Sequence, residues 1–124
     1  VAPLEDMYPP KRYSGDIVIP PKVTSGNTFS VIGISKAFTG CTDLTSVTIP
    51  NSIKSIQSQA FEACIGLTSV SIPASVTYIG EGAFENCIRL TAIYCQAKTQ
   101  PLGWDTNWNP NKYKVVWGAI DKFK

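Results

Sequence analysis

The 124-residue chain contains no histidine. Histidine is the usual general base for serine and cysteine nucleophiles, so its absence removes the residue pairs on which most covalent catalysis depends. Two acidic pairs remain, Glu5 with Asp6 and Glu81 with Glu85. We expect both pairs to lie in water, because the sequence pattern offers no cleft that would raise a carboxyl pKa for acid catalysis. The chain is therefore not expected to be an enzyme.

Long apolar runs and clustered charges are also missing. No apolar stretch approaches the roughly 20 residues that a membrane-spanning helix needs, and no signal segment follows Val1. The absence of that segment says nothing about location. The 11 basic and 9 acidic residues are scattered and give a net charge of +2, without the basic stripe typical of nucleic-acid binding. Neither nucleic acid nor membrane insertion is expected.

The chain does contain a sequence motif that recurs with a fixed 23-residue period. Its copies begin at Ala37, Ala60 and Ala83, and each one opens with Ala-Phe and places a cysteine three positions after the phenylalanine. With 44% hydrophobic residues the chain is globular in composition. A fixed period of this length predicts a solenoid, in which each repeat is one coil stacked on the next. The shared apolar positions are Phe38, Cys41, Leu44, Val47 and Ile49; Phe61, Cys64, Leu67, Val70 and Ile72; and Phe84, Cys87 and Leu90.

Each repeat predicts three local elements. Apolar Val47 and Ile49 alternate with polar Ser46 and Thr48, and this period of two residues is typical of a half-buried strand. The strand is expected to end at Pro50. A second extended stretch is expected at residues 53–56 and 76–79. A short helix or single helical turn is expected at residues 58–64, where apolar positions share one face at helical spacing.

The ends of the array depart from the period and predict caps. Two strand-like runs joined by Ser25-Gly26-Asn27 indicate a hairpin in the first coil. At the other end, counting one full period onward from Ile93 reaches Val116, so we expect a last strand at residues 113–117 to extend the sheet in register. The expected organisation is an irregular arm at 1–13 and a single domain at 14–124, with an N-terminal capping coil at 14–36, repeats at 37–59, 60–82 and 83–102, and a C-terminal cap at 103–124.

The motif is similar to the BspA-like class of leucine-rich repeats, bacterial surface proteins with 23-residue repeats. The resemblance rests on Ala-Phe-x-x-Cys-x-x-Leu-Thr-Ser-Val-x-Ile-Pro and covers residues 17–102, and the tail resembles an end cap of the family. It implies an α/β leucine-rich-repeat right-handed superhelix, with parallel strands on one face and short helical turns on the other. It also implies a secreted or cell-surface protein that acts in adhesion or protein recognition, with host extracellular proteins among its partners. The family has no common catalytic residues or cofactors. The third coil departs from the pattern, because Cys95-Gln96 replaces its Ile-Pro step.

All four cysteines fall on repeat positions. Cys41, Cys64 and Cys87 share one column, and Cys95 takes the place of Ile49 in its coil. We expect buried, reduced thiols that act as small apolar side chains. Coils about 4.8 Å apart would still allow a disulfide between neighbouring members of the column. A metal site is not expected, because the column spreads its thiols along an axis and no histidine assists them.

One further segment, Asp105-x-Asn107-x-Asn109, matches the opening of a calcium-binding loop. Pro110 stands where that loop needs glycine, and Val116 where it needs glutamate. We expect an ordinary Asn/Asp turn.

Two sets of residues are candidates for binding a partner. The first is the outward side of the strands, which is small and mostly hydroxylic: Asp16, Val18, Ser46, Thr48, Ser69, Ser71, Ala92 and Tyr94. The second is the aromatic pair Trp104 and Trp108. With Trp117, Tyr94 and Tyr113 they form a C-terminal group of aromatic residues, of which we expect two or three to plug the last coil and one to stay exposed. The favoured hypothesis is a non-catalytic module that binds a protein through the strand side. The alternative is a carbohydrate-binding protein in which Trp104, Trp108 and Tyr94 stack on sugar rings.

Overall fold

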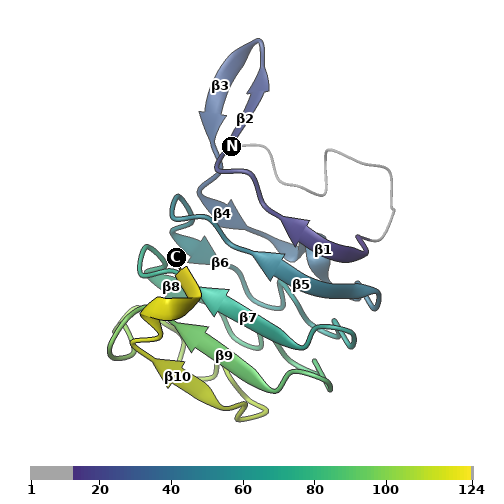
Figure 1. Cartoon of the computed structure of the whole chain (residues 1–124), viewed down its shortest axis with the longest axis vertical. Coiled ribbons are helices and arrows are strands. Elements are labelled where there is room, and N and C mark those ends of the chain that lie inside the picture. The colour runs from purple at the N-terminus through teal and green to yellow at the C-terminus, as the bar shows by residue number, and fades with distance from the viewer. Residues whose placement is uncertain (1–12, 124) are drawn as a thin grey trace.

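The computed structural model describes residues 13–123, which wind into a solenoid with parallel strands stacked along its length (Figure 1). The predicted fold class is confirmed, since successive repeats place their strands side by side in two parallel sheets. The larger sheet has the order β1 (Gly15–Val18), β5 (Leu44–Thr48), β7 (Ser69–Ile72), β9 (Ala92–Cys95) and β10 (Val115–Trp117). The smaller sheet has the order β4 (Gly33–Ile34), β6 (Ser55–Ile56) and β8 (Tyr78–Ile79).

The core is a ladder of repeated apolar side chains between these sheets. Phe38 and Phe61 stack with ring centroids 5.1 Å apart, and Phe61 and Phe84 with centroids 5.2 Å apart. Tyr13 covers the N-terminal end of this aromatic column at 4.8 Å from Phe38. The irregular arm expected at residues 1–13 otherwise lies outside the described residues. Stacking therefore supplies the burial that one coil could not achieve alone.

The first coil contains the expected hairpin. Asp16 pairs with Ser46, a separation longer than the repeat period, and the longer connection holds β2 (Lys22–Ser25) and β3 (Asn27–Ser30). These two strands pair antiparallel around Gly26, whose φ of 78° suits glycine. Figure 1 shows the hairpin projecting beyond the end of the solenoid.

The last strand joins the sheet one position out of the predicted register. Val115, not Val116, pairs with Ile93, so this coil is one residue shorter than the repeat period. A shift of one residue exchanges the two faces of a strand, and accordingly Val115 packs against the core while Val116 pairs with outward-facing Tyr94. The prediction was wrong because the connecting segment follows no repeat that could fix its length.

The helix predicted at residues 58–64 is also wrong, because this segment is a series of turns. Gln59 and Ala63 both have φ of 60°, which an α-helix cannot accommodate. Their N–H groups donate instead to the next coil, to the carbonyls of Glu81 and Glu85 at 3.2 and 2.8 Å. Within the described residues the helices are short 3-10 segments, including η2 (Lys36–Phe38) and η3 (Ile120–Phe123), and none is long enough to cross a membrane.

All four cysteines are buried, as expected from their repeat positions, and all are reduced. The column has a role beyond filling space. The thiol of Cys64 donates to the carbonyl of Phe38 at 3.0 Å, and that of Cys87 to the carbonyl of Phe61 at 3.1 Å. These thiols thus form hydrogen bonds between consecutive coils.

Candidate interaction surface

The strand face is the outward side of the larger sheet, and the sheet register brings its predicted members into two rows. The first row runs across neighbouring strands through Asp16, Ser46, Ser69 and Ala92, and the second through Val18, Thr48, Ser71 and Tyr94. Asp16, Val18 and Thr48 are exposed, and the three serines are half-buried. The outward residues from separate repeats thus form one continuous surface.

Asp16 is held in place at the β1 end of this face. Its carboxylate accepts hydrogen bonds from the hydroxyls of Ser46, at 2.7 Å, and Thr45, at 3.1 Å. These two bonds, led by that of Ser46, hold the pKa of the Asp16 carboxyl below its usual value. This end of the strand face therefore carries a fixed negative charge at neutral pH.

Ala92 does not contribute to an accessible surface, although the sequence pattern placed it on the outward side. Its exposed fraction is only 6%. The register is as predicted, since Ala92 lies beside Ser69. The expectation that it contacts a partner is wrong because a methyl group between neighbouring strands lies below the side chains around it.

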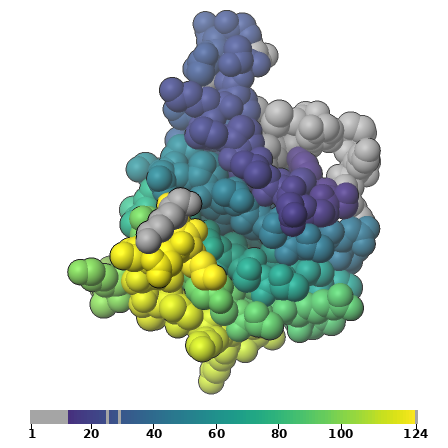
Figure 2. Space-filling model, viewed as in Figure 1, coloured from purple at the N-terminus to yellow at the C-terminus, as the bar shows by residue number. Residues whose placement is uncertain are grey.

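The C-terminal segment crosses the other end of the strand face. After β10 the chain turns back over β9, with hydrogen bonds from Gly118 N to Ala97 O at 2.8 Å and from Ala119 N to Cys95 O at 2.9 Å. In η3 the Lys122 ammonium then lies 4.5 Å from the centre of the Tyr94 ring. In Figure 2 this yellow segment lies at the lower left, on the side of the molecule that faces the viewer. Tyr94 is consequently half-buried, and no sequence pattern predicted this crossing because it follows the last repeat.

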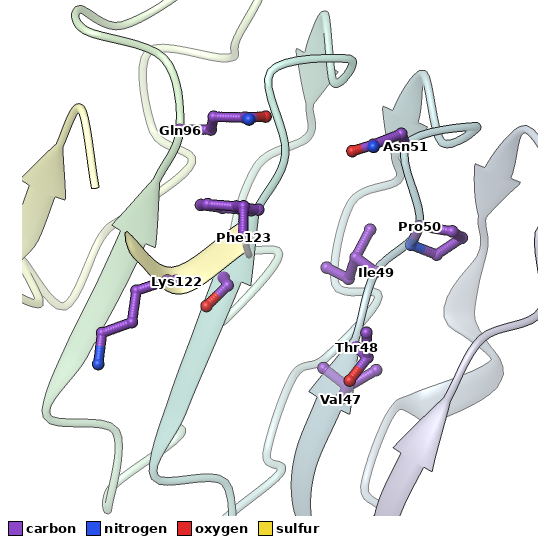
Figure 3. A pocket seen from close by; sticks show the side chains of 9 residues that line it. Val47, Thr48, Ile49, Pro50, Asn51, Gln96, Lys122 and Phe123 are labelled. Carbon is purple, nitrogen blue, oxygen red and sulfur yellow. The ribbon is translucent and has the colours of Figure 1, made fainter. Parts of the chain in front are cut away.

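A groove remains between η3 and the end of β5, which we call the strand groove (Figure 3). Its volume is about 300 Å³. Thr48 and Ser71 come from the predicted face, whereas Asn51, Gln96, Lys122 and Phe123 were not anticipated. The complete lining is Val47, Thr48, Ile49, Pro50, Asn51, Ser71, Gln96, Lys122 and Phe123.

Trp104 and Trp108 plug the C-terminal coil and are each 4% exposed. Their rings meet edge to face at 4.9 Å, and Trp117 lies 5.7 Å from Trp104. Their indole N–H groups donate to Val76 O at 3.2 Å and Gln100 Oε1 at 3.1 Å. The expectation that they plug the last coil is confirmed. The expectation that they are also exposed contacts for a partner is wrong, because a solenoid end must cover its core. The carbohydrate alternative thereby loses two of its three stacking platforms, and Tyr94 is half-buried.

The segment from Asp105 to Asn109 uses its side chains to close turns. Asp105 accepts a hydrogen bond from Asn107 N at 2.8 Å, and Asn109 bonds both the N–H and the carbonyl of Tyr113 at 3.0 Å. Among residues 13–123 no group of three or more histidine, cysteine or acidic side chains could hold a metal ion.

Comparison with known proteins assigns the repeats. The model of the BspA type leucine rich repeat region matches residues 17–109, in six copies. A leucine rich cell surface protein from Faecalibacterium prausnitzii A2-165 is 33% identical over 65% of the chain, with a TM-score of 0.56. A leucine-rich repeat protein from Bacteroides ovatus ATCC 8483 is 24% identical over 89% of the chain, with a TM-score of 0.51, and shows the fold alone. The chain spans 26% and 37% of the lengths of these two proteins. No curated protein matched.

Proposed function

This chain belongs to the BspA-type leucine-rich repeat family, and we propose that it is a non-catalytic module that binds a protein partner through its strand face. The observation that carries the proposal is the continuity of that face across β1, β5 and β7, three strands from three coils that contribute Asp16 and Val18, Thr48, and Ser71. A surface that combines exposed and half-buried hydroxyl groups with a fixed charge suits the hydrogen-bonded contacts of a protein interface.

We further propose that the module acts outside the cell, in adhesion, and that host extracellular proteins are the partners to test first. Support comes from the similar Faecalibacterium protein, which is described as a cell surface protein. The four reduced thiols are compatible with that location because all of them are buried.

The test begins with cross-linking capture on intact producing cells and on host matrix proteins, followed by identification of the captured partner. Affinity for that partner is then compared between the wild-type chain and the double variant Val18→Lys, Ser69→Lys, which disrupts both rows of the strand face. We expect at least a tenfold loss, because both substitutions place long charged side chains in the contact.

The control is the double variant Gln57→Lys, Thr99→Lys, which adds the same charge at exposed positions away from the strand face. It should bind as the wild type does, and thermal unfolding should verify that both variants fold. Equal affinity of the face variant and the wild type would refute the proposal.

A further inference from the structure

We infer that the strand groove binds an acidic peptide segment of the partner, with a carboxylate at Lys122 and a neighbouring apolar side chain against Phe123. The inference rests on the proposed function and specifies the chemistry of the partner at one part of the strand face. Four features of the groove lead to it: its shape, its charge, its hydrogen-bonding groups and its apolar wall.

The shape follows from the course of the C-terminal segment over the sheet. It crosses β9 at Tyr94, and Phe123 comes to lie over the end of β7, with the turn at Pro50 and Asn51 opposite (Figure 3). The space between them, about 300 Å³ above Ser71, lies at the lower end of the range for sites that hold small groups. It can accept one or two side chains of a peptide but not a folded element.

The charge favours an anion. Lys122 is the one charged residue among those that line the groove, and none of them is acidic. Its contact with the Tyr94 ring restrains the ammonium without neutralising it. Asp16 lies on the same face but on the edge strand β1, and its hydrogen-bonded carboxylate repels an anion from that end of the face. The strand face thus has a polarity that directs a carboxylate toward Lys122.

The remaining polar groups are able to complete the site. The hydroxyls of Thr48 and Ser71 and the amide of Asn51 can donate hydrogen bonds to carboxylate or peptide oxygens. Gln96 is already oriented, since its Oε1 accepts a hydrogen bond from Ala74 N at 2.9 Å. The single ammonium of Lys122 balances the one negative charge of a carboxylate, whereas a phosphate group carries about two.

The apolar wall explains why a peptide is preferred to a free acid. Phe123 and Pro50 are only half-buried, and together with Ile49 they line one part of the groove. An aliphatic or aromatic residue next to the acidic one would cover them and bury their exposed area. The expected motif is therefore Asp or Glu beside an apolar residue.

The experiment selects ligands from a phage-displayed library of random dodecapeptides on the wild-type chain. Enriched peptides are synthesised with a fluorescent label, and their dissociation constants are measured by anisotropy. We expect enrichment of Asp or Glu next to an apolar residue. Replacing that acid by its amide, or Lys122 by glutamate, should weaken binding roughly tenfold or more.

A control variant and a second groove variant test whether binding takes place in the groove. The control, Lys54→Glu, makes the same charge change as Lys122→Glu at an exposed lysine outside the groove and should leave affinity unchanged. Thr48→Trp fills the groove from β5 without altering η3 and should abolish binding even if Lys122→Glu disturbs the C-terminal segment. Two results would overturn the inference. One is the enrichment of peptides that contain no acidic residue. The other is that acidic peptides bind Lys122→Glu and Thr48→Trp as tightly as they bind the wild type.

Failure of the inference is distinguishable from failure of the proposed function. In one outcome the double variant Val18→Lys, Ser69→Lys loses binding of the peptides or the partner while Lys122→Glu and Thr48→Trp retain it. That result would support the strand face as the binding surface and would reject the groove as the peptide site. Polygalacturonate serves as a carbohydrate probe of the same charge. Lys122-dependent binding of polygalacturonate without any peptide binding would reject the peptide in favour of an acidic glycan.

Discussion

The thiol of Cys64 lies 3.0 Å from the carbonyl oxygen of Phe38, one coil earlier. That carbonyl also accepts the N–H of Cys41 at 3.1 Å, within its own coil. The Phe38 carbonyl therefore joins the turn of its own coil to the thiol of the next, and the Phe61 carbonyl does the same with Cys64 N and the thiol of Cys87. The repeated cysteine links coils as well as filling the core.

We predict that Cys64→Ala lowers the free energy of unfolding by about 1–2 kcal/mol, because it removes this bond and leaves a small cavity. Chemical denaturation measures the change. The matched control is Ile65→Ala at the next position, which is 38% exposed and should cost less. Equal unfolding midpoints for Cys64→Ala and the wild type would contradict the prediction.

Cys95 should make the protein less stable in alkali. Burial raises the pKa of its thiol from the ordinary 9.0 to about 12. Between pH 9 and 12 the unfolded chain therefore loses this proton while the folded chain retains it, so stability falls as pH rises, by at most about 1.4 kcal/mol per pH unit. Cys95→Val places an aliphatic side chain where the other coils have Ile49 and Ile72. It should reduce the fall of stability with pH because it removes the thiol. Denaturation midpoints of both proteins from pH 8 to 11 test this, and parallel curves would count against it.

One position of the repeat has a left-handed backbone conformation in each coil, and a substitution there should stabilise the protein. Gly40, Ala63 and Asn86 occupy the same position in successive repeats and have φ of 73°, 60° and 62°. Because this conformation costs a non-glycine residue about 1–2 kcal/mol, and glycine gives part of that back as chain entropy, Ala63→Gly should stabilise by about 0.5–1 kcal/mol. Gly40→Ala should destabilise by a similar amount. Thermal unfolding of both variants and the wild type tests these changes. A lower melting temperature for Ala63→Gly than for the wild type would contradict the prediction that the left-handed conformation of Ala63 costs stability.

Ser52 and Ser75 occupy the same position in consecutive repeats but differ in bonding. Ser52 donates to Val31 O at 2.6 Å, whereas the buried Ser75 hydroxyl has no partner among the described residues. Ser52→Ala should therefore lose about 1 kcal/mol of stability. Ser75→Ala should be neutral or slightly stabilising, since it removes an unsatisfied group. Equal losses in the two variants would argue against the difference in bonding.

The Asp16 carboxyl should titrate at unusually low pH. The hydroxyls of Ser46 and Thr45 lower its folded-state pKa below 3.8, so its contribution to stability is present above that pH and is lost as the pH falls further. NMR titration of the side-chain carboxyl should show the low pKa in the wild type and a higher one in Ser46→Ala. An unchanged pKa in that variant would remove Ser46 as the cause.

The elements that repeat could be derived from the amino-acid sequence. The repeat period predicts the stacking of Phe38, Phe61 and Phe84, the burial of the cysteines and the outward direction of Ser46 and Thr48, because identical coils can share one core only in register. The hairpin was also predictable, since its turn residues are local signals.

The arrangement of the chain where the period ends depends on the tertiary structure. The shortened last coil and the crossing of η3 over Tyr94 rest on contacts between segments with no repeated partner. The turn at Ala63 likewise follows from a hydrogen bond to the next coil, which outweighs local helix propensity. Local pattern thus specifies a coil, whereas the caps, and the strand groove that one of them forms, arise from long-range packing.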